Sequence, residues 1–304
     1  MNLGIAMDGL AAPGDRRELE AALAALRPKL HRYCARMTGT VFDGEDAVQD
    51  ALAHALRAFD AGARPDNLEA WLMRITHNAA IDFLRRRARQ SSLMSDEMIE
   101  DPADAAPTAE ERHLAASSLR AFLALPVAQR GSVILMDVLG YSLGEIAGML
   151  RLSQPAVKAA LHRGRERLRT AAAALEVHPA PVLSAAQRSL YERYVDRFNA
   201  RDFEAIRDML AEEVWLDMVA RTRMKGAAEV SGTYLRNYGL AEDWRLALGV
   251  VDGRPALIVH DPADPAATSA YFVQLEWDGE RVAGIRDFRY ARYVIDGAKA
   301  HLLA

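Results

Sequence analysis

The sequence predicts a multidomain chain in which two all-α domains precede an α+β domain. Residues 15–89 follow the helical period, and residues 141–169 form two short helices around a tight turn. Beyond Ser184, apolar and polar residues begin to alternate as they do in strands. The 304 residues are enough for two or three domains, each with its own core.

Composition and charge limit the function. The net charge of −4 argues against a nucleic-acid binder, because DNA is held largely through its phosphates; however, the charges are unevenly distributed, so local charge decides. The single cysteine, Cys34, allows no intramolecular disulfide and no cysteine-based zinc site. No stretch approaches the ~18 apolar residues of a membrane span, and the N-terminus lacks a signal-peptide pattern. We expect a cytoplasmic protein without a metal or cofactor.

The first two predicted helices differ in their outer faces. Leu19–Thr38 is amphipathic, and Pro28 either sits within this helix or divides it. Asp43 is expected to cap a second helix that runs to Asp60. Its predicted outer face is acidic and comprises Glu45, Asp46, Gln49 and Asp50. Alone, that pattern also fits an ordinary solvated helix face.

A loop, Asp60–Asn67, leads into the third helix, WLMRITHNAAIDFLRRRAR. An apolar stripe predicts its buried side. A polar stripe lies apart from it and comprises Arg74, Asn78, Asp82 and Arg85. The helix ends in a basic run of Arg85, Arg86, Arg87 and Arg89. These arginines fit phosphate contacts, charges favoured at a helix C-terminus, or both.

Residues 91–111 change character. Acidic residues and two prolines replace the helical period, which predicts a flexible acidic linker. Helices are expected again over His113–Leu125 and from Pro126 to about Leu139.

The hairpin Tyr141–Arg169 contains two helix starts. Ser142 and Glu145 form a capping box, and Ser153 is a second N-cap candidate with Pro155 in the first turn. The second helix has an apolar side and is otherwise strongly basic. The pattern fits a helix-turn-helix whose second helix enters the major groove, or a helical hairpin with a solvated basic face.

The chain beyond Ser184 predicts helices followed by strands. The helices are expected over residues 187–199, 203–210 and 227–238. The strand candidates are residues 246–251, 255–260, 269–277 and 281–293, with a hairpin turn at Asp278-Gly279. This order is typical of an α+β domain with a curved sheet.

In this order, the segments resemble an extracytoplasmic-function sigma factor. DGEDAVQDALAHALRAFD resembles region 2.2, WLMRITHNAAIDFLRRRAR resembles regions 2.3 to 2.4, and the segment from Leu125 to Leu168 resembles region 4. The resemblance covers roughly residues 15–170. Arg151 departs from it, because the family's turn often has glycine there. From about residue 184 the tail resembles a SnoaL-like domain of the NTF2-like superfamily, although Val251–Arg254 is only a faint echo of a DGGGK-like segment.

The resemblance implies a domain plan. Residues 1–90 would be the region 2 bundle, 91–112 the acidic linker and 113–175 the region 4 helix-turn-helix. Residues 176–184 would be a second linker, and 185–304 a cone-shaped regulatory domain. The acidic linker would either pass through the polymerase or serve as a solvated tether.

The resemblance also implies partners. The acidic face of the second helix would bind the β′ clamp helices of core RNA polymerase, region 4 would meet the β flap, and both helical domains would contact promoter DNA. The predicted −10 contacts are Arg74, Asn78, Asp82, Arg85, Arg86, Arg87 and Arg89. The predicted −35 contacts are Ser153, Gln154, Ala156, Lys158, His162, Arg163 and Arg165. Gln154 and Lys158 suit base edges, whereas Arg163 and Arg165 suit phosphates.

The tail allows two interpretations. Polar residues on strand candidates would line a pocket, or would be surface and core residues, because sequence alone does not fix the strand register. These residues are Asp217, His260, Tyr271 and Asp287. We expect a non-enzymatic tail that modulates the sigma core, with an anti-sigma factor or a small-molecule ligand as a further partner. The alternatives are a SnoaL-like enzymatic tail, or a ligand-sensing helix-turn-helix regulator that binds DNA without polymerase.

Overall fold

The computed structural model describes residues 15–92, 119–174, 183–242, 244–263 and 269–303. The chain folds as two compact units, Met1–Glu176 and Val177–Ala304. Among the described residues, no helix combines the length and the apolar character that a membrane crossing requires.

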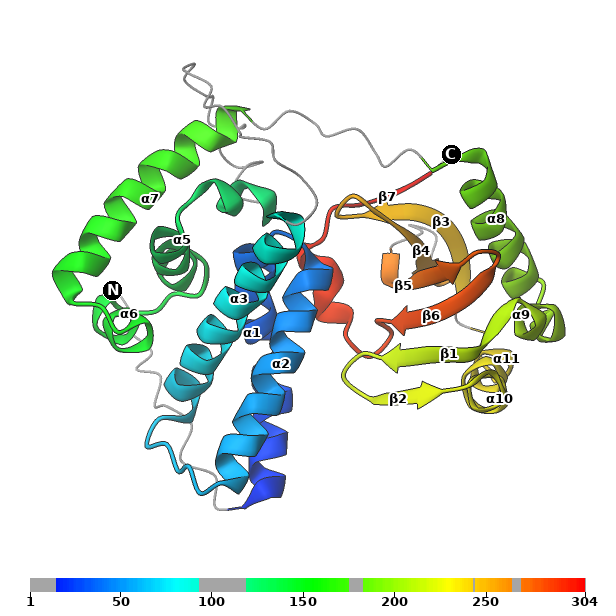
Figure 1. Ribbon diagram of the computed structural model, residues 1–304, viewed down its shortest axis with the longest axis horizontal. Helices are drawn as coiled ribbons and strands as arrows, with labels where there is room; N and C mark the ends of the chain where they lie inside the picture. The colour runs from blue at the N-terminus through cyan, green and yellow to red at the C-terminus, as the bar shows by residue number, and fades with distance from the viewer. Residues whose placement is uncertain (1–14, 93–118, 175–182, 243, 264–268, 304) are drawn as a thin grey trace. The chain divides into compact units, whose positions relative to one another are not determined.

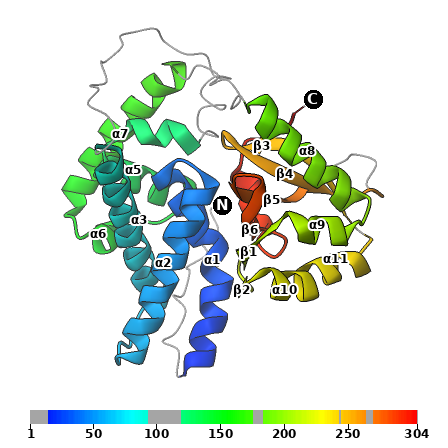
Figure 2. The ribbon, with the colours of Figure 1, turned by 45° about the vertical axis from the view of Figure 1, so that its right-hand side comes forward.

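Three long helices begin the first unit and run side by side in Figures 1 and 2: α1 (Arg16–Thr38), α2 (Val41–Asp60) and α3 (Leu68–Ser92). Pro28 lies within α1 and does not divide it. Buried leucines on both sides of Pro28, Leu26 and Leu30, pack into one core. Their packing offsets the backbone hydrogen bond that proline removes.

The start of α2 differs from the prediction. Its N-cap is Thr40, whose hydroxyl accepts a hydrogen bond of 3.1 Å from the Asp43 backbone N–H. Asp43 lies in the first turn, and its carboxylate pairs with Arg87 of α3 at 2.6 Å. Asp43 therefore joins two helices and does not cap one.

The second half of this unit is built from shorter elements: η1 (Leu119–Ala124), α5 (Val127–Val133), η2 (Ile134–Val138), α6 (Leu143–Leu150) and α7 (Gln154–Ala174). The expected helix from Pro126 changes into a π-helical turn at η2. The capping box of Ser142 and Glu145 opens α6, as predicted. Ser91 and Ser92, predicted to begin the acidic linker, instead end α3, and the rest of the linker lies outside the described residues.

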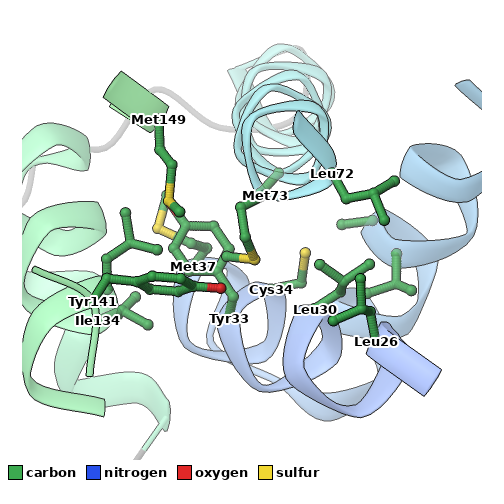
Figure 3. Close-up of a cluster of buried hydrophobic side chains, with 14 of the residues drawn as sticks. Leu26, Leu30, Tyr33, Cys34, Met37, Leu72, Met73, Ile134, Tyr141 and Met149 are labelled. Atoms are coloured by element: carbon green, nitrogen blue, oxygen red, sulfur yellow. The ribbon is translucent and has the colours of Figure 1, made fainter. Parts of the chain in front are cut away.

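One core joins these two groups of helices. Figure 3 shows Tyr33 and Met37 of α1 and Met73 of α3 close to Ile134, Tyr141 and Met149, and Leu30 belongs to the same cluster. Fully burying a leucine-sized side chain contributes about 2 kcal/mol, so a cluster of this size holds the groups firmly. The helices expected to form two separate domains therefore share one hydrophobic core.

Polar contacts cross the same boundary. The Arg130 guanidinium donates to the carbonyls of Leu123 and Leu125, and also to that of Met37 near the end of α1. The Tyr141 hydroxyl donates to Glu69 of α3 at 2.5 Å, and Lys29 of α1 pairs with the same carboxylate. These charge-assisted hydrogen bonds require a defined geometry, which apolar packing does not, so they fix the orientation of the two groups of helices.

The second unit begins with α8 (Ala185–Asn199) and α9 (Phe203–Met209). A third helical segment, predicted over residues 227–238, is the series α10 (Ala227–Glu229), η3 (Val230–Leu235) and α11 (Arg236–Leu240). A capping box of Ser184 and Gln187 starts α8. Aromatic side chains at helical spacing, such as Tyr194 and Phe198, are buried toward the sheet.

A seven-stranded mixed sheet completes this unit, in the order β2-β1-β6-β5-β4-β3-β7 (Figure 1). The strands are β1 (Leu210–Met218), β2 (Thr222–Lys225), β3 (Arg245–Val251), β4 (Arg254–His260), β5 (Ser269–Asp278), β6 (Arg281–Asp287) and β7 (Ala300–Leu302). The predicted α+β class and the Asp278-Gly279 turn are confirmed.

Three strands, β1, β2 and β7, lie outside the predicted ranges, and β6 is shorter than predicted. It ends at Asp287, where the chain turns with the Ala291 N–H donating to the Phe288 carbonyl. The following η4 (Arg292–Gly297) replaces the expected continuation of the strand.

Candidate nucleic-acid interface

The basic helix α7 presents a continuous exposed stripe. Gln154, Lys158 and His162 recur every four residues and are exposed, while Val157 and Leu161 are buried. The Ser153 hydroxyl caps the helix by accepting a 3.3 Å hydrogen bond from the Ala156 N–H. All seven residues predicted to meet −35 DNA are exposed: Ser153, Gln154, Ala156, Lys158, His162, Arg163 and Arg165.

Arg165 has a structural contact that the sequence did not reveal. Its Nε and Nη2 donate to the two carboxylate oxygens of Asp137, at 2.9 and 2.5 Å. This pairing raises the pKa of Arg165 above its usual value. The contact joins α7 to η2, so Arg165 orients the helix as well as carrying charge. Arg163, also exposed, is the better test of a purely electrostatic contact.

The turn between α6 and α7 contains a backbone conformation that favours glycine. Arg151 has φ 54° and ψ 44°, and its N–H donates to the Ala147 carbonyl. The left-handed conformation costs a residue with a Cβ about 1 kcal/mol. Arginine therefore occupies this position at that cost, as expected from the sequence.

Substituting Arg151→Gly is expected to raise the free energy of unfolding by about 0.5–1 kcal/mol, because glycine adopts positive φ without the clash of a Cβ. Urea denaturation followed by circular dichroism measures the change. Arg151→Ala is the control, since alanine keeps the Cβ. An equal gain in both variants would show that the arginine side chain, and not its backbone, is the source.

On α3, the predicted −10 stripe is exposed at Asn78, Asp82 and Arg85, and partly buried at Arg74. Asp82 and Arg85 lie 3.6 Å apart as a surface pair. Arg86 pairs with Asp50 at 2.6 Å and Arg87 with Asp43. These two arginines thus hold α2 against α3, a role that the basic run did not predict, while Arg89 is exposed.

The loop that leads into α3 is ordered by Arg64. Its Nη1 donates to the carbonyls of Phe59 and Ala63, at 2.9 and 2.8 Å, and its guanidinium lies 3.9 Å from the centre of the Phe59 ring. Asn67 caps α3 by accepting from the Ala70 N–H at 2.9 Å. The sequence predicted a loop over Asp60–Asn67 but not this role of Arg64.

The acidic face of α2 is only partly as predicted. Glu45 is fully buried and its carboxylate pairs with Arg27 of α1, so it does not lie on an outer face. An unpaired buried carboxylate is costly, which explains why the arginine accompanies it. Asp46, Gln49 and Asp50 are half-buried.

In the tail, the four candidate pocket residues do not form one site. Asp217 pairs in register with Arg286 on β6, whereas Asp287 follows one residue later and faces the opposite side of the sheet. Tyr271 lies on the same side as Asp287. His260 is at the end of β4, half-buried, in register with Ser269. The interpretation in which all four residues line one pocket therefore does not fit the sheet, whereas the interpretation as surface and core residues remains open.

Asp287 is the centre of a buried polar cluster. Tyr234 and Tyr238 donate to its Oδ2 at 3.0 and 2.7 Å, and the Arg289 N–H donates to its Oδ1 at 2.7 Å. The Tyr271 hydroxyl shares a 3.0 Å hydrogen bond with that of Tyr238. Burial raises the pKa of Asp287, although these hydrogen bonds oppose the change.

The cluster connects η3 and α11 to the sheet, and this structural role is enough to account for its buried hydrogen bonds. Its two helical tyrosines were missed, although their spacing of four residues puts them on one helix face. Within the described residues, no three His, Cys, Asp or Glu side chains gather closely enough to hold a metal ion.

Comparisons with known proteins agree with the helical geometry. The Sigma-70 region 2 family matches residues 23–90, and the Sigma-70, region 4 family matches residues 119–168. The RNA polymerase sigma factor CarQ of Myxococcus xanthus is 31% identical over 170 positions, covering 55% of this chain and 96% of CarQ. The ECF sigma factor SigM of Mycobacterium tuberculosis is 32% identical over 155 positions, covering 51% and 77%.

These matches define the class as the sigma-70 type of transcription initiation factor. Within this class, the chain belongs to the extracytoplasmic-function (ECF) family of RNA polymerase sigma factors. It therefore binds core RNA polymerase and promoter DNA and directs promoter-specific initiation.

Similarity extends into the tail. SigG of Mycobacterium tuberculosis is 28% identical over 307 aligned positions, which cover 91% of this chain and 83% of SigG. Among solved structures, that of the Mycobacterium tuberculosis sigma factor SigJ covers 88% of this chain and 95% of its own, at 19% identity and a TM-score of 0.34. The sigma factor RpoE of Bartonella quintana, solved with the anti-sigma factor NepR, covers 51% and 96%, at 24% identity and a TM-score of 0.41.

Proposed function

We propose that two exposed helical stripes read the two promoter elements. Asn78, Asp82 and Arg85 on α3 would face the non-template strand of the −10 element, and the exposed face of α7 would enter the major groove at −35. The observation that carries this proposal is that both polar stripes are exposed, each on a helix within a matching sigma-70 region. Arg74 and Arg89 would add contacts to the −10 strand.

The −10 stripe would work with the loop that Arg64 orders. A base in the −10 element must leave the stack to be read from the non-template strand, and the loop that leads into α3 would form the pocket that receives it. Polymerase binding would use the half-buried Asp46, Gln49 and Asp50, through contact of their acidic surface with basic residues of the β′ clamp. Glu45 would support this surface from within by its pair with Arg27.

Two substitutions on α7 separate base reading from phosphate binding. Lys158→Ala is expected to change the preferred −35 bases, since one bidentate base contact gives about 1–3 kcal/mol of discrimination. Arg163→Ala is expected to weaken holoenzyme binding to all promoters by the same factor, because phosphate contacts carry no sequence information. Binding of the holoenzyme to a panel of −35 variants distinguishes these outcomes.

Arg165→Ala should also weaken all promoters, and in addition it removes the Asp137 contact. An Asp137→Asn variant is its control, because it weakens the same contact and keeps Arg165. A loss of thermal stability in both variants would show how much of the effect of Arg165→Ala comes from losing this contact. If Lys158→Ala and Arg163→Ala had the same profile across the panel, the proposed division of roles would be refuted.

We propose that the tail regulates the sigma core and has no catalytic role of its own, in a protein that works in the cytoplasm with core polymerase. The Asp287 carboxylate accepts hydrogen bonds from Tyr234, Tyr238 and the Arg289 N–H, which supports a structural role for this cluster over a catalytic one. An anti-sigma factor would be a further regulator. Transcription by purified core polymerase with the full chain or with residues 1–183 tests this. We expect altered promoter output after removal of the tail, and unchanged output would refute regulation by the tail.

The enzymatic alternative has one observation in its favour, because a carboxyl group among tyrosines is an arrangement that can stabilise an oxyanion in an apolar site. It predicts turnover that depends on Asp287 and survives loss of residues 1–180. The helix-turn-helix regulator predicts instead a palindromic operator bound without polymerase.

A further inference from the structure

A pocket of about 540 Å³ opens on the side of the tail's sheet opposite the Asp287 cluster. Trp215 and Asp217 of β1 line it, together with their register partners Lys225 and Arg223 on β2. Arg286 on β6 completes the row beside Asp217. Its size is in the range of sites for small organic molecules.

One wall of the pocket is apolar and fixed by a glycine. Trp215 lies opposite Gly284 of β6, and a Cβ at that glycine would come within 2.3 Å of the indole Cε2. The indole can therefore lie against the neighbouring strand only because Gly284 has no side chain. Met224 is also part of the lining, while its side chain packs against the tail's hydrophobic core.

The other end of the pocket is charged. The Asp217 carboxylate lies between two guanidinium groups, 3.4 Å from Arg223 Nε and 3.7 Å from Arg286 Nε. The side chains of Asp217 and Arg286 are only 7% and 17% exposed, whereas that of Arg223 is 68% exposed. Two planar guanidinium groups thus flank one carboxylate at this end of the pocket.

The other charged residues of the lining lie around Lys225. Lys225 Nζ pairs with Glu213 at 2.6 Å, and the carboxylate of Glu229, which also lines the pocket, accepts from the Lys225 backbone N–H at 3.3 Å. The two guanidinium groups are therefore the cations of the lining that lie beside Asp217.

We propose that this pocket binds a small, flat organic carboxylate of one or two rings. The ligand's carboxylate would meet Arg223 and Arg286, whose planar groups match carboxylate geometry, and its rings would pack on Trp215. Asp217 would hold the two arginines in position and exclude dianions by repulsion. The proposal is independent of promoter recognition, because binding is measured without polymerase or DNA.

Isothermal titration calorimetry of the full chain tests this with 2-naphthoate and its neutral analogue, 2-naphthamide. We expect the carboxylate to bind at least about tenfold more tightly than the amide, because a charge-assisted pair is lost in the amide. Arg223→Gln should weaken naphthoate binding by about tenfold while leaving the amide unchanged. Trp215→Leu should weaken both ligands.

Arg245→Gln is the matched control, because Arg245 is an exposed arginine on β3 that does not line the pocket. It should bind naphthoate like the unaltered chain. The proposal would be overturned by absence of binding at millimolar naphthoate, by equal affinity for the amide, or by equal losses in Arg223→Gln and Arg245→Gln. Thermal unfolding of each variant shows that the comparison is made on folded protein.

Discussion

Lowering the pH from 7 to 5 is expected to cost the helical unit about 2 kcal/mol of stability for each of two buried histidines. Burial lowers the pKa of both His31 and His77 from 6.5 to about 4. Nearby Arg27 and Arg36 lower that of His31 further, while its Nε2–H donates to the Val41 carbonyl at 3.0 Å. The Tyr33 hydroxyl and His77 Nδ1 share a 2.7 Å hydrogen bond.

The direction of the effect follows from proton binding. Below pH 6.5 the unfolded chain protonates these histidines, but the folded unit keeps them neutral until about pH 4, so protons favour unfolding. The stabilisation is complete above pH 6.5 and is lost as the pH falls through this window. Urea unfolding at pH 7, 6 and 5, followed by helical circular dichroism, measures the loss.

His31→Gln and His77→Gln are each expected to remove about half of this pH dependence while lowering stability at pH 7 through imperfect packing. His54→Gln is the control, because His54 is exposed on α2. Parallel pH profiles for the unaltered chain and both buried-site variants would contradict the assignment.

Features encoded over a few residues were predictable from the sequence. The capping box of Ser142 and Glu145, the N-cap Ser153 and the turn at Asp278-Gly279 all depend on neighbours within four positions. The exposed stripes of α3 and α7 follow from helical period alone. The amino-acid sequence was therefore enough to place the −35 residues on the exposed side of their helix.

Features that depend on distant partners were not predictable. Glu45 looked like a surface acid because nothing local identifies Arg27 as its partner on another helix. Asp43 is likewise engaged by Arg87, 44 residues away. Burial of a charge is decided by such long-range pairing, which helical periodicity does not encode.

The tail shows the same limit in a sheet. Asp217 and Asp287 lie on opposite faces because β1 pairs in parallel with β6, a strand about 70 residues later. A shift of one residue in that register would exchange the faces. The polar residues could thus be named, but the two sites they form, the tyrosine cluster and the arginine pocket, required the strand pairing.

Arg130→Met is expected to lower the free energy of unfolding of the helical unit by about 3 kcal/mol. The guanidinium is buried and donates to three main-chain carbonyls, two just before α5 and one, Met37, 93 residues earlier. Methionine fills similar space but leaves these carbonyls without their donors. Because burial also lowers the pKa of Arg130, the site tolerates its charge only through these bonds.

Arg130→Lys separates charge from geometry. Lysine keeps the positive charge but cannot reproduce the planar fork, so we expect it to recover only a minor part of the loss. Arg120→Met, at an exposed position of η1, should change stability by no more than about 0.5 kcal/mol. Urea denaturation of the three variants measures these changes in the free energy of unfolding. A lysine variant as stable as the unaltered chain would show that a positive charge at position 130 is enough, without the planar geometry of arginine. Equal losses in Arg130→Met and Arg120→Met would show that the contact with Met37 does not hold the two helical groups together.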